Sequence, residues 1–295
     1  MKILVFGATG MLGHKLVQEL SKTEEVFATV RISSRTAFER LKIIDPCRLV
    51  NFSIHYDICE AIRSCHPDAV INCIGIVKQL EQAKYSLPTI TTNSLFPHQL
   101  NEACRHLDIK RMIHVSTDCV FNGKKDEGAP PYGEMDVPGP EDLYGRSKLL
   151  GEVSEAPGVT LRTSIIGREL YSTTGLVEWF LSQKDKKVKG FSKALYTGFT
   201  TIEFARVVRH ALQAALEPGV YHVSSDEISK FELLELIRQK YEIPATIEKD
   251  KDFRCDRRME SSRFRRMVCY HPPPWDEMIE EMAKDPTPYD EWRAK

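Results

Sequence analysis

The chain has 295 residues, of which 42% are hydrophobic and 28% are charged, and its formal net charge is −1. This composition is typical of an ordinary globular protein, and the near-zero charge gives no indication of a nucleic acid or an anionic membrane as partner. No apolar run approaches the roughly 20 residues that a membrane-spanning helix needs, and no signal-peptide pattern is present, so we expect a cytoplasmic protein.

The first half of the chain alternates short β-rich runs with helical patterns. In chain order it predicts a strand at residues 2–6, a glycine turn at 7–13, a helix at 11–21, strands at 26–31, about 49–54 and 68–75, a helix at about 93–107 and a strand at 111–117. The run at 68–75 is continuously apolar, which is typical of a strand buried on both faces of a parallel sheet.

A long loop separates the two halves. Residues 122–142 are rich in glycine and proline, and a loop of this length inside a compact domain is often functional. Beyond it the patterns predict a helix at 144–154, a strand at 159–167, helices at about 175–183 and 203–215, a strand at 219–224, a helix at 230–240 and an amphipathic helix near the end.

The repeated strand–helix alternation predicts an α/β fold with a doubly wound parallel sheet of the Rossmann type. We expect residues 1–167 to form the sheet domain, with about 201–224 completing the sheet. Residues 168–200 and 225–295 are expected to form a smaller C-terminal cap. The eight cysteines form no C-x-x-C pair and several lie in apolar runs, so buried reduced thiols are expected, and no metal site is predicted.

Three glycines directly follow the first predicted strand and open a helix. Gly7, Gly10 and Gly13 would give a tight turn, let the backbone approach a diphosphate, and let the helix pack closely on the strand. The helix N-terminus then presents free N–H groups to the phosphates. The turn is therefore predicted to bind a dinucleotide, with contacts from the residues between these glycines as well: Thr9, Met11 and Leu12.

The second predicted strand indicates which dinucleotide binds. NAD enzymes usually carry an acidic residue at the end of this strand, whereas here it ends at Arg31. A guanidinium there would pair with the 2′-phosphate of NADP(H), which is the predicted cofactor; the alternative is an arginine that is simply solvated. Further cofactor contacts are expected after the third strand, at Asp57 and Ile58, and at the end of the fourth, at Cys73, Ile74 and Gly75.

Tyr144 and Lys148 lie four residues apart and would share one face of a helix. An ammonium beside a phenol lowers the tyrosine pKa, which would suit Tyr144 to pass a proton to a carbonyl while a nicotinamide delivers hydride. Lys148 would also bind the nicotinamide ribose. Ser116, Thr117 and Asp118 end a neighbouring strand, where a hydroxyl would stabilise the charge that develops on the same carbonyl oxygen. A simple turn or helix cap is the alternative for these three residues.

Three segments carry a family resemblance: GATGMLG, VSTDCVFNG and LYGRSKLLGE. In this order and spacing the chain resembles the extended short-chain dehydrogenases/reductases. More narrowly, it is similar to the dTDP-4-dehydrorhamnose reductase group of nucleotide-sugar 4-keto reductases. The resemblance runs from residue 1 to about residue 282 and includes LRTSIIG and DRRMESSRF. It implies an NADP-binding domain with a substrate-binding cap, and Thr117, Tyr144 and Lys148 as the catalytic residues.

The resemblance also implies the reaction, which is reduction at C4 of a 6-deoxy-4-keto nucleotide sugar. Asp118 would contact the sugar, and the cap segments 191–201 and 257–263, including Arg257, would face the nucleotide. Lys78 departs from the group's usual pattern and is a further substrate candidate. A UDP-linked 2-acetamido-2,6-dideoxy-4-keto sugar is therefore an expectation equal to the dTDP-linked one, with a solvated Lys78 as the alternative.

Two other functions fit the same fold. One is a non-catalytic NADP-binding regulatory subunit, which would have no need of Thr117, Tyr144 and Lys148 together. The other is an epimerase or dehydratase; epimerases keep NAD bound, whereas Arg31 favours exchangeable NADPH, and the residue after Asp118 is Cys119 rather than glutamate. We expect no nucleic acid or membrane partner. A homodimer is compatible with the sequence, which does not define the oligomeric state.

Overall fold

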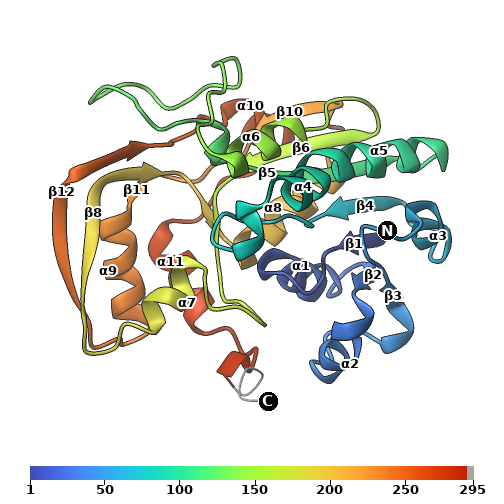
Figure 1. The fold of residues 1–295 in the computed structure, drawn as a ribbon, viewed down its shortest axis with the longest axis horizontal. Helices are drawn as coiled ribbons and strands as arrows, with labels where there is room; N and C mark the ends of the chain where they lie inside the picture. Colours follow the sequence, from blue (N-terminus) through green and yellow to red (C-terminus); the bar gives the residue numbers. More distant parts are fainter. Residues whose placement is uncertain (291–295) are drawn as a thin grey trace.

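A seven-stranded sheet with every strand pair parallel lies at the centre of the computed structural model, which describes residues 1–290. Its strand order is β10-β6-β5-β4-β1-β2-β3 (Figure 1). The strands are β1 (Lys2–Phe6), β2 (Glu25–Val30), β3 (Leu49–Asn51), β4 (Ala69–Asn72), β5 (Arg111–Thr117), β6 (Gly158–Thr163) and β10 (Gly219–His222). The chain reverses its direction of winding between β1 and β4, as doubly wound folds do. The predicted fold class is confirmed.

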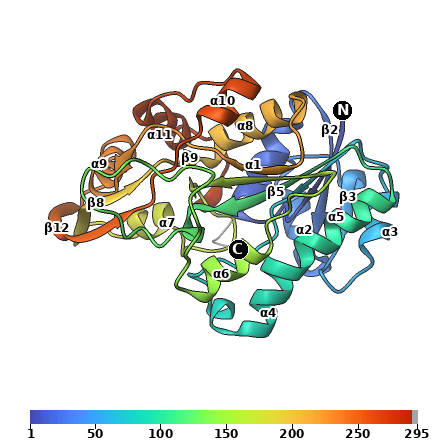
Figure 2. The ribbon, with the colours of Figure 1, turned by 90° about the horizontal axis from the view of Figure 1, so that it is seen from above.

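Helices cover both faces of this sheet (Figure 2). On one face, α1 (Met11–Leu20), α2 (Ile32–Arg40) and α8 (Thr201–Gln213) bury apolar side chains against the strands. On the other face, α3 (Ile58–Arg63) and α5 (Phe96–His106) enclose a second apolar cluster. The short helices α4 (Ser86–Ile90) and α6 (Leu143–Leu150) lie beside α5, and α8 and β10 return the chain to the sheet after the first cap segment.

A smaller unit lies beside the carboxyl ends of the central strands. Its sheet has the order β11-β8-β12, with β12 parallel and β11 antiparallel to β8. Its elements are β8 (Lys187–Tyr196), β11 (Ile228–Ser229), β12 (Thr246–Asp256), α7 (Leu176–Leu181), α9 (Lys230–Lys240), α10 (Ser262–Val268) and α11 (Trp275–Ala283). Residues 291–295 of the predicted cap lie outside the described residues.

The long strands β8 and β12 were not predicted from the sequence. β12 is mostly exposed and β8 mostly half-buried, and both carry charged residues, some of which pair across the strands; Lys189 Nζ lies 3.1 Å from Asp250 Oδ2. Such strands lack the regular apolar alternation that identifies a half-buried strand.

Several predicted boundaries were wrong. The predicted helix at 93–107 begins earlier, because helical structure starts at Ser86 and passes through a π-helical turn, η3 (Thr91–Leu95), before α5. The helix predicted at 144–154 ends at Leu150, and the strand predicted at 159–167 divides into β6 and β7 (Ile165–Ile166). β7 pairs with β9 (Phe199–Thr200) in a small separate sheet. The remaining short helical turns are η1 (Pro46–Arg48), η2 (Glu81–Lys84) and η4 (Asp118–Val120).

All eight cysteines are free thiols, although Cys47 and Cys269 are exposed rather than buried. Across residues 1–290 no helix combines the length and apolar character needed to cross a bilayer. The same residues contain no cluster of three or more acidic, histidine or cysteine side chains arranged to hold a metal ion.

Candidate functional site

The glycine turn between β1 and α1 leaves no room for side chains. Gly7 has a positive φ of 86°, and a Cβ atom on Gly13 would lie 2.1 Å from the Gly7 carbonyl oxygen. Gly10 precedes the first helical residue, and no side chain caps this end of α1. The N-terminal N–H groups and the positive end of the helix dipole therefore remain available, which fits the diphosphate of a dinucleotide.

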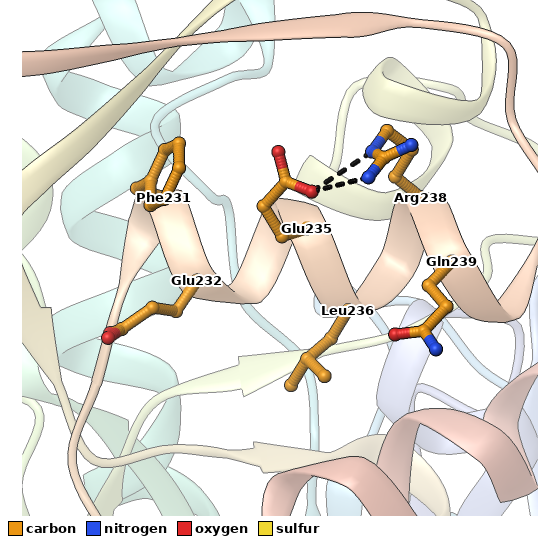
Figure 3. A pocket seen from close by; sticks show the side chains of 6 residues that line it. All are labelled: Phe231, Glu232, Glu235, Leu236, Arg238 and Gln239. Carbon is orange, nitrogen blue, oxygen red and sulfur yellow. Dashed lines mark hydrogen bonds and ion pairs between the residues drawn. The ribbon is translucent and has the colours of Figure 1, made fainter.

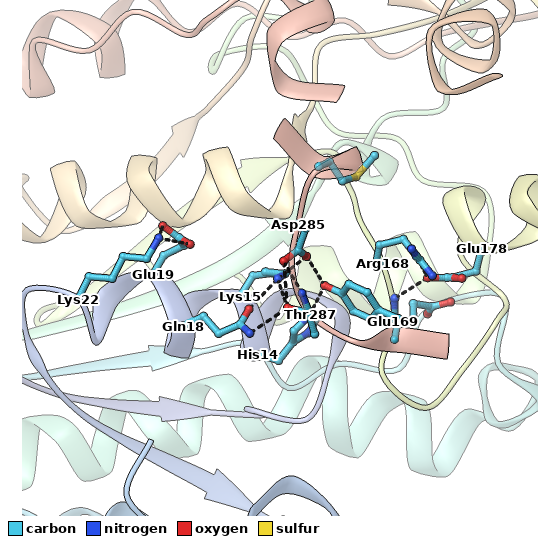
Figure 4. A network of polar contacts seen from close by, with 12 residues as sticks. His14, Lys15, Gln18, Glu19, Lys22, Arg168, Glu169, Glu178, Asp285 and Thr287 are labelled. Carbon is cyan, nitrogen blue, oxygen red and sulfur yellow. Dashed lines mark hydrogen bonds and ion pairs between the residues drawn. The ribbon is translucent and has the colours of Figure 1, made fainter. Parts of the chain in front are cut away.

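The first turns of α1 are anchored by the end of the chain. Figure 4 shows His14, Lys15 and Gln18 facing the segment that carries Asp285 and Thr287. His14 Nδ1 lies 2.9 Å from the Gly10 carbonyl oxygen, so His14 donates a hydrogen bond back to the glycine turn. Lys15 and Asp285 form a buried ion pair. This anchoring was missed from the sequence, because no local pattern relates α1 to a segment some 270 residues away.

Arg31 stands at the start of α2 and is exposed. Arg35, by contrast, is engaged within the protein, since its guanidinium donates hydrogen bonds to the Leu49 and Pro46 carbonyl oxygens and to the Glu39 carboxylate. Arg31 is therefore the better placed of the two to meet a phosphate.

Asp57, one of the predicted cofactor residues, also has a structural role. Its carboxylate caps α3 by accepting hydrogen bonds from the backbone N–H groups of Cys59, at 2.7 Å, and Glu60, at 3.2 Å. Ile58 is half buried and packs on the apolar cluster around α3 and α5.

The end of β4 lies directly against the glycine turn. A Cβ atom on Gly7 would stand 3.0 Å from the Ile74 backbone nitrogen and 3.1 Å from the Cys73 carbonyl carbon. Of the predicted cofactor residues here, Cys73 and Ile74 are half buried and Gly75 is exposed. The structure thus brings two of the predicted cofactor-binding segments together at one edge of the sheet.

Thr117 and Tyr144 meet at the carboxyl end of β5. Gly145 allows this, because a Cβ atom there would lie 2.4 Å from the Cys119 carbonyl oxygen, so α6 begins in close contact with η4. Asp142 caps α6 by accepting a hydrogen bond from the Gly145 N–H at 2.7 Å. Burial is the main cause that raises the pKa of Tyr144, while a hydrogen bond with the Thr117 side chain acts in the opposite direction. The phenol is consequently protonated at neutral pH and can donate a proton.

Lys148 does not have the role toward Tyr144 that the sequence predicts. Its Nζ lies 2.7 Å from the Val115 carbonyl oxygen and 3.2 Å from Nε2 of His114, beneath the strand ends. The predicted lowering of the Tyr144 pKa by this ammonium was wrong, because burial of the phenol dominates. Burial also lowers the pKa of Lys148 to about 8, and Glu152 and Cys73 act against that shift.

Arg257 links the cap to the sheet domain, and its charge acts on Asp118. Arg257 Nε donates a hydrogen bond to the Phe121 carbonyl oxygen at 3.0 Å, and Nη1 lies 3.3 Å from Cys119 Sγ. Asp118 is buried and accepts a hydrogen bond from Thr117 at 3.2 Å. Burial raises the pKa of Asp118, while the positive charges of Arg257 and of the exposed Lys78 act in the opposite direction.

Two cap residues at this site were not singled out from the sequence. The Tyr196 hydroxyl is buried and has no hydrogen-bond partner among the described residues. Burial raises the pKa of Tyr196, and the charge of Asp118 raises it further. Lys230 lies over the rings of Trp179 and Phe191, at 5.3 and 5.2 Å. Burial and then the charge of Lys78 lower the Lys230 pKa. Only the tertiary fold reveals this placement, since in sequence Lys230 merely follows the helix cap Ser229.

Asn93, in the π-helical turn η3, ties the loop after β4 to α6. Its side chain accepts a hydrogen bond from the Ile76 N–H at 2.8 Å and donates to the Ile76 carbonyl oxygen at 2.9 Å and to Ser147 Oγ at 3.1 Å. π-helical turns are frequent at functional sites. Here the turn links the loop that carries Lys78 to the helix that carries Tyr144.

A surface hollow on α9 has no part in this site. Figure 3 shows its lining side chains, all of which come from this one helix: Phe231, Glu232, Glu235, Leu236, Arg238 and Gln239. Glu235 and Arg238 neutralise each other at 2.7 Å. A hollow built from one helix and containing a closed ion pair offers no convergent polar groups to a ligand.

Residues 1–287 match the family described as the RmlD substrate binding domain. The chain belongs to this family. Among its relatives, methionine adenosyltransferase 2 subunit beta of Danio rerio is 25% identical over 83% of this chain and 75% of its own length. The dTDP-4-keto-6-deoxy-D-glucose reductase of Streptomyces niveus is 29% identical over 50% of this chain and 45% of its own.

A solved structure shares the same fold. It is the dTDP-4-dehydrorhamnose reductase of Bacillus anthracis str. Ames in complex with NADP. It is 20% identical to this RmlD-family chain and covers 95% of it, with 98% of its own length aligned and a TM-score of 0.76.

Proposed function

We propose that this RmlD-family chain is an NADPH-dependent reductase of the C4 ketone of a 6-deoxy-4-keto nucleotide sugar. The observation that carries the proposal is the meeting of Thr117 with a protonated Tyr144 at the carboxyl end of β5. The reductase relative and the NADP-bound structure of the same fold support it.

The cofactor would supply hydride, and the glycine turn would hold its diphosphate. The turn residues concerned are Gly7, Thr9, Gly10, Met11, Leu12 and Gly13. Arg31 would pair with the 2′-phosphate, Asp57 and Ile58 would lie at the adenine, and Lys148 would lie at the nicotinamide ribose. The segment Cys73, Ile74 and Gly75 would pass beside the cofactor.

Tyr144 would donate its phenolic proton to the ketone oxygen, and Thr117 would hydrogen-bond the same oxygen as negative charge develops there. Asp118 would accept hydrogen bonds from the sugar hydroxyls. Lys78, Arg257 and Lys230 supply positive charge on the cap side, where a nucleoside diphosphate would lie. We accordingly propose residues 1–167 and about 201–224 as the NADP domain, and 168–200 with 225–295 as the substrate cap.

One experiment tests the function and the sugar together. NADPH oxidation is measured with a dTDP-linked 4-keto-6-deoxy sugar and with a UDP-linked 2-acetamido-4-keto-6-deoxy sugar, side by side. Turnover of either substrate supports the reductase and identifies its nucleotide sugar. Absence of turnover with both, by protein that binds NADPH, contradicts the proposal.

The similarity to an adenosyltransferase subunit favours a second candidate, an NADP-binding regulatory subunit. This candidate predicts NADPH binding without turnover of either keto sugar. The same assay therefore separates the two functions, provided that NADPH binding is measured in parallel by fluorescence titration.

Replacing Arg31 by alanine should weaken NADPH binding about tenfold or more while leaving NADH binding nearly unchanged. A charge-assisted contact with a phosphate contributes roughly 1.5–3 kcal/mol, and 1.4 kcal/mol corresponds to a factor of ten. Dissociation constants for both cofactors provide the measurement. Arg40→Ala, at the far end of the same helix, is the matched control. An equal loss for NADPH and NADH would refute a 2′-phosphate contact.

Replacing Lys230 by glutamine should raise KM for the nucleotide sugar about tenfold and leave kcat within a factor of about two. The reason is that Lys230 would bind the substrate remote from the reacting carbonyl, an interaction made equally in ground and transition states. Lys249→Gln is the matched control, because Lys249 also lies over an aromatic ring, that of Phe231 at 5.0 Å, but is exposed, whereas Lys230 is half-buried. An unchanged KM in Lys230→Gln would exclude this contact.

A further inference from the structure

Three buried polar side chains, those of Asn72, His114 and Lys148, are linked in a row by hydrogen bonds near the carboxyl ends of β4 and β5. His114, on β5, is fully buried, with its Nδ1 3.1 Å from Nδ2 of Asn72 on β4 and its Nε2 3.2 Å from Nζ of Lys148 on α6. Asn72 is also fully buried and Lys148 is 5% exposed. Their hydrogen bonds must therefore be satisfied within the protein.

The direction of these hydrogen bonds follows from one backbone group. The Ile74 N–H can only donate, and it lies 3.0 Å from Asn72 Oδ1, which fixes the carbonyl side of the amide. Asn72 Nδ2 must then face His114 and donate to Nδ1. Burial of the ring is the largest cause that lowers the His114 pKa well below its usual value, so the imidazole is neutral. A neutral ring that accepts at Nδ1 carries its proton on Nε2.

This tautomer points an N–H group at Lys148. An uncharged amine has a lone pair that accepts from Nε2–H and two hydrogens, one of which reaches the Val115 carbonyl oxygen at 2.7 Å. An ammonium has three donors and no lone pair, so it would oppose the Nε2–H donor. The hydrogen bonds that join Asn72, His114 and Lys148 each pair a donor with an acceptor only when Lys148 is uncharged.

The other charged or titratable groups near these three side chains do not reverse that preference. Glu152 is neutralised by Arg162, whose Nη2 lies 2.6 Å from Glu152 Oε2. The Cys73 thiol is neutral, because burial raises its pKa to about 12. His98 is exposed, and its Nε2 lies 2.8 Å from the Leu150 carbonyl oxygen rather than against His114.

We propose that Asn72 and His114 are positioning residues that hold Nε2–H against Lys148 and thereby favour its uncharged amine in the ligand-free protein. The inference deepens the proposed function, on which it rests in one respect, namely that Lys148 is a catalytic residue. Asn72 and His114 would thus allow Lys148 to exist as an amine that can accept a proton close to neutral pH, before any substrate binds.

The tautomer can be read directly in the ligand-free protein. Long-range ¹H–¹⁵N NMR spectra of histidine-labelled protein distinguish Nε2–H from Nδ1–H rings, and correlation to the backbone assigns each ring without a variant. His114 should be the Nε2–H form. His222 is the internal control of opposite type, because its Nδ1 faces the Tyr132 carbonyl oxygen at 3.1 Å and its Nε2 faces Arg162. An Nδ1–H form at His114 overturns the proposal.

The charge of Lys148 is measured by the pH titration of its Cε resonance in protein labelled at lysine. The midpoint should lie near pH 8 in the natural sequence. In Asn72→Asp a carboxylate oxygen that only accepts replaces the donor, so His114 should switch to Nδ1–H and the Lys148 midpoint should rise by about one pH unit or more. Should Asn72→Asp fail to fold, His114→Gln, whose amide oxygen can accept from an ammonium, should raise the midpoint likewise.

A midpoint near the ordinary lysine value in the natural sequence, or one that neither variant moves, overturns the proposal. A purely structural role for His114 would change stability without shifting this midpoint. Neither NMR measurement uses cofactor or substrate. A protein that fails to reduce any keto sugar would therefore contradict the proposed function alone, whereas a wrong tautomer would contradict only this inference.

Discussion

Tyr144→Phe is expected to reduce keto-sugar-dependent NADPH oxidation by about 10³-fold or more while changing the NADPH dissociation constant less than twofold. The variant removes only the hydroxyl that would donate a proton to the ketone oxygen, and a positioned general acid contributes typically 10²–10⁴-fold. Because burial raises the Tyr144 pKa, the natural enzyme holds this proton throughout the neutral range. The rate is measured at saturating substrate, so that the loss appears in kcat.

Tyr221→Phe is the matched control, since it removes a phenol hydroxyl that donates to the Glu217 carbonyl oxygen. Glu217 precedes the first residue of β10, away from the carboxyl end of β5 where Tyr144 lies. It should retain nearly full activity. If Tyr144→Phe keeps more than about a tenth of the natural rate, another group donates the proton and the assignment of the site is wrong. If both variants lose activity equally, the effect reports folding rather than catalysis.

The parts of this fold that sequence predicts are those encoded by local patterns. The glycine turn, the buried strands and the four-residue spacing of Tyr144 and Lys148 can each be read within a short window. Thr117 could be grouped with them because the carboxyl ends of parallel strands meet at one edge of a sheet. The sheet edge, the turn and Tyr144 are accordingly where they were expected.

The parts that escaped prediction depend on contacts between distant segments. Asn72, His114 and Lys148 come from two neighbouring strands and a helix, and only the register that pairs Asn72 with His114 brings them together. The four-residue spacing predicts Lys148 as a functional residue, but no local pattern predicts that its side chain turns toward His114. Its effect on the Tyr144 phenol was wrongly predicted, because spacing along a helix gives a shared face and not the direction of a long side chain.

The cap escaped prediction for a different physical reason. β8 and β12 satisfy their backbone groups by pairing with each other, while β12 is mostly exposed and charged and β8 carries lysines among half-buried residues. The apolar periodicity that reports burial is therefore weak in both strands. Lys230 and Tyr196 reach the site from elements around this sheet, so their role could not be read before the sheet itself was known.

Lys15→Met is expected to destabilise the protein by about 3–5 kcal/mol, the usual effect of removing one partner of a buried ion pair. Lys15 and Asp285 have side chains only 3% and 6% exposed, and the lysine Nζ also donates to Gln18 Oε1 and Thr287 Oγ1 (Figure 4). Methionine preserves the length of the apolar stem but leaves the Asp285 charge buried without its partner. Thermal unfolding should show a fall in Tm of roughly 5–10 °C.

The pH dependence of this loss identifies its cause. Burial acts to raise the Asp285 pKa, but Lys15 and the hydrogen bonds around the carboxylate outweigh it, and the net pKa is lowered. A carboxyl whose folded pKa is depressed stabilises the fold above its unfolded pKa and loses that contribution as pH falls through the folded value. In Lys15→Met the unpartnered carboxyl should protonate more readily, so the difference in Tm from the natural protein should be largest near neutral pH and shrink in acid.

Two further variants complete the test. Lys22→Met breaks an ion pair between Lys22, just beyond the end of α1, and Glu19 on α1. Because Lys22 is 62% exposed, this substitution should lower the free energy of unfolding by less than about 1 kcal/mol. Lys15→Met combined with Asp285→Leu removes both buried charges and should recover part of the lost stability, because the penalty comes from the charge left alone. A Lys15→Met protein as stable as Lys22→Met would mean that the chain end does not hold α1. In that case local packing alone would hold the glycine turn in shape, even though His14 donates a hydrogen bond to the Gly10 carbonyl oxygen.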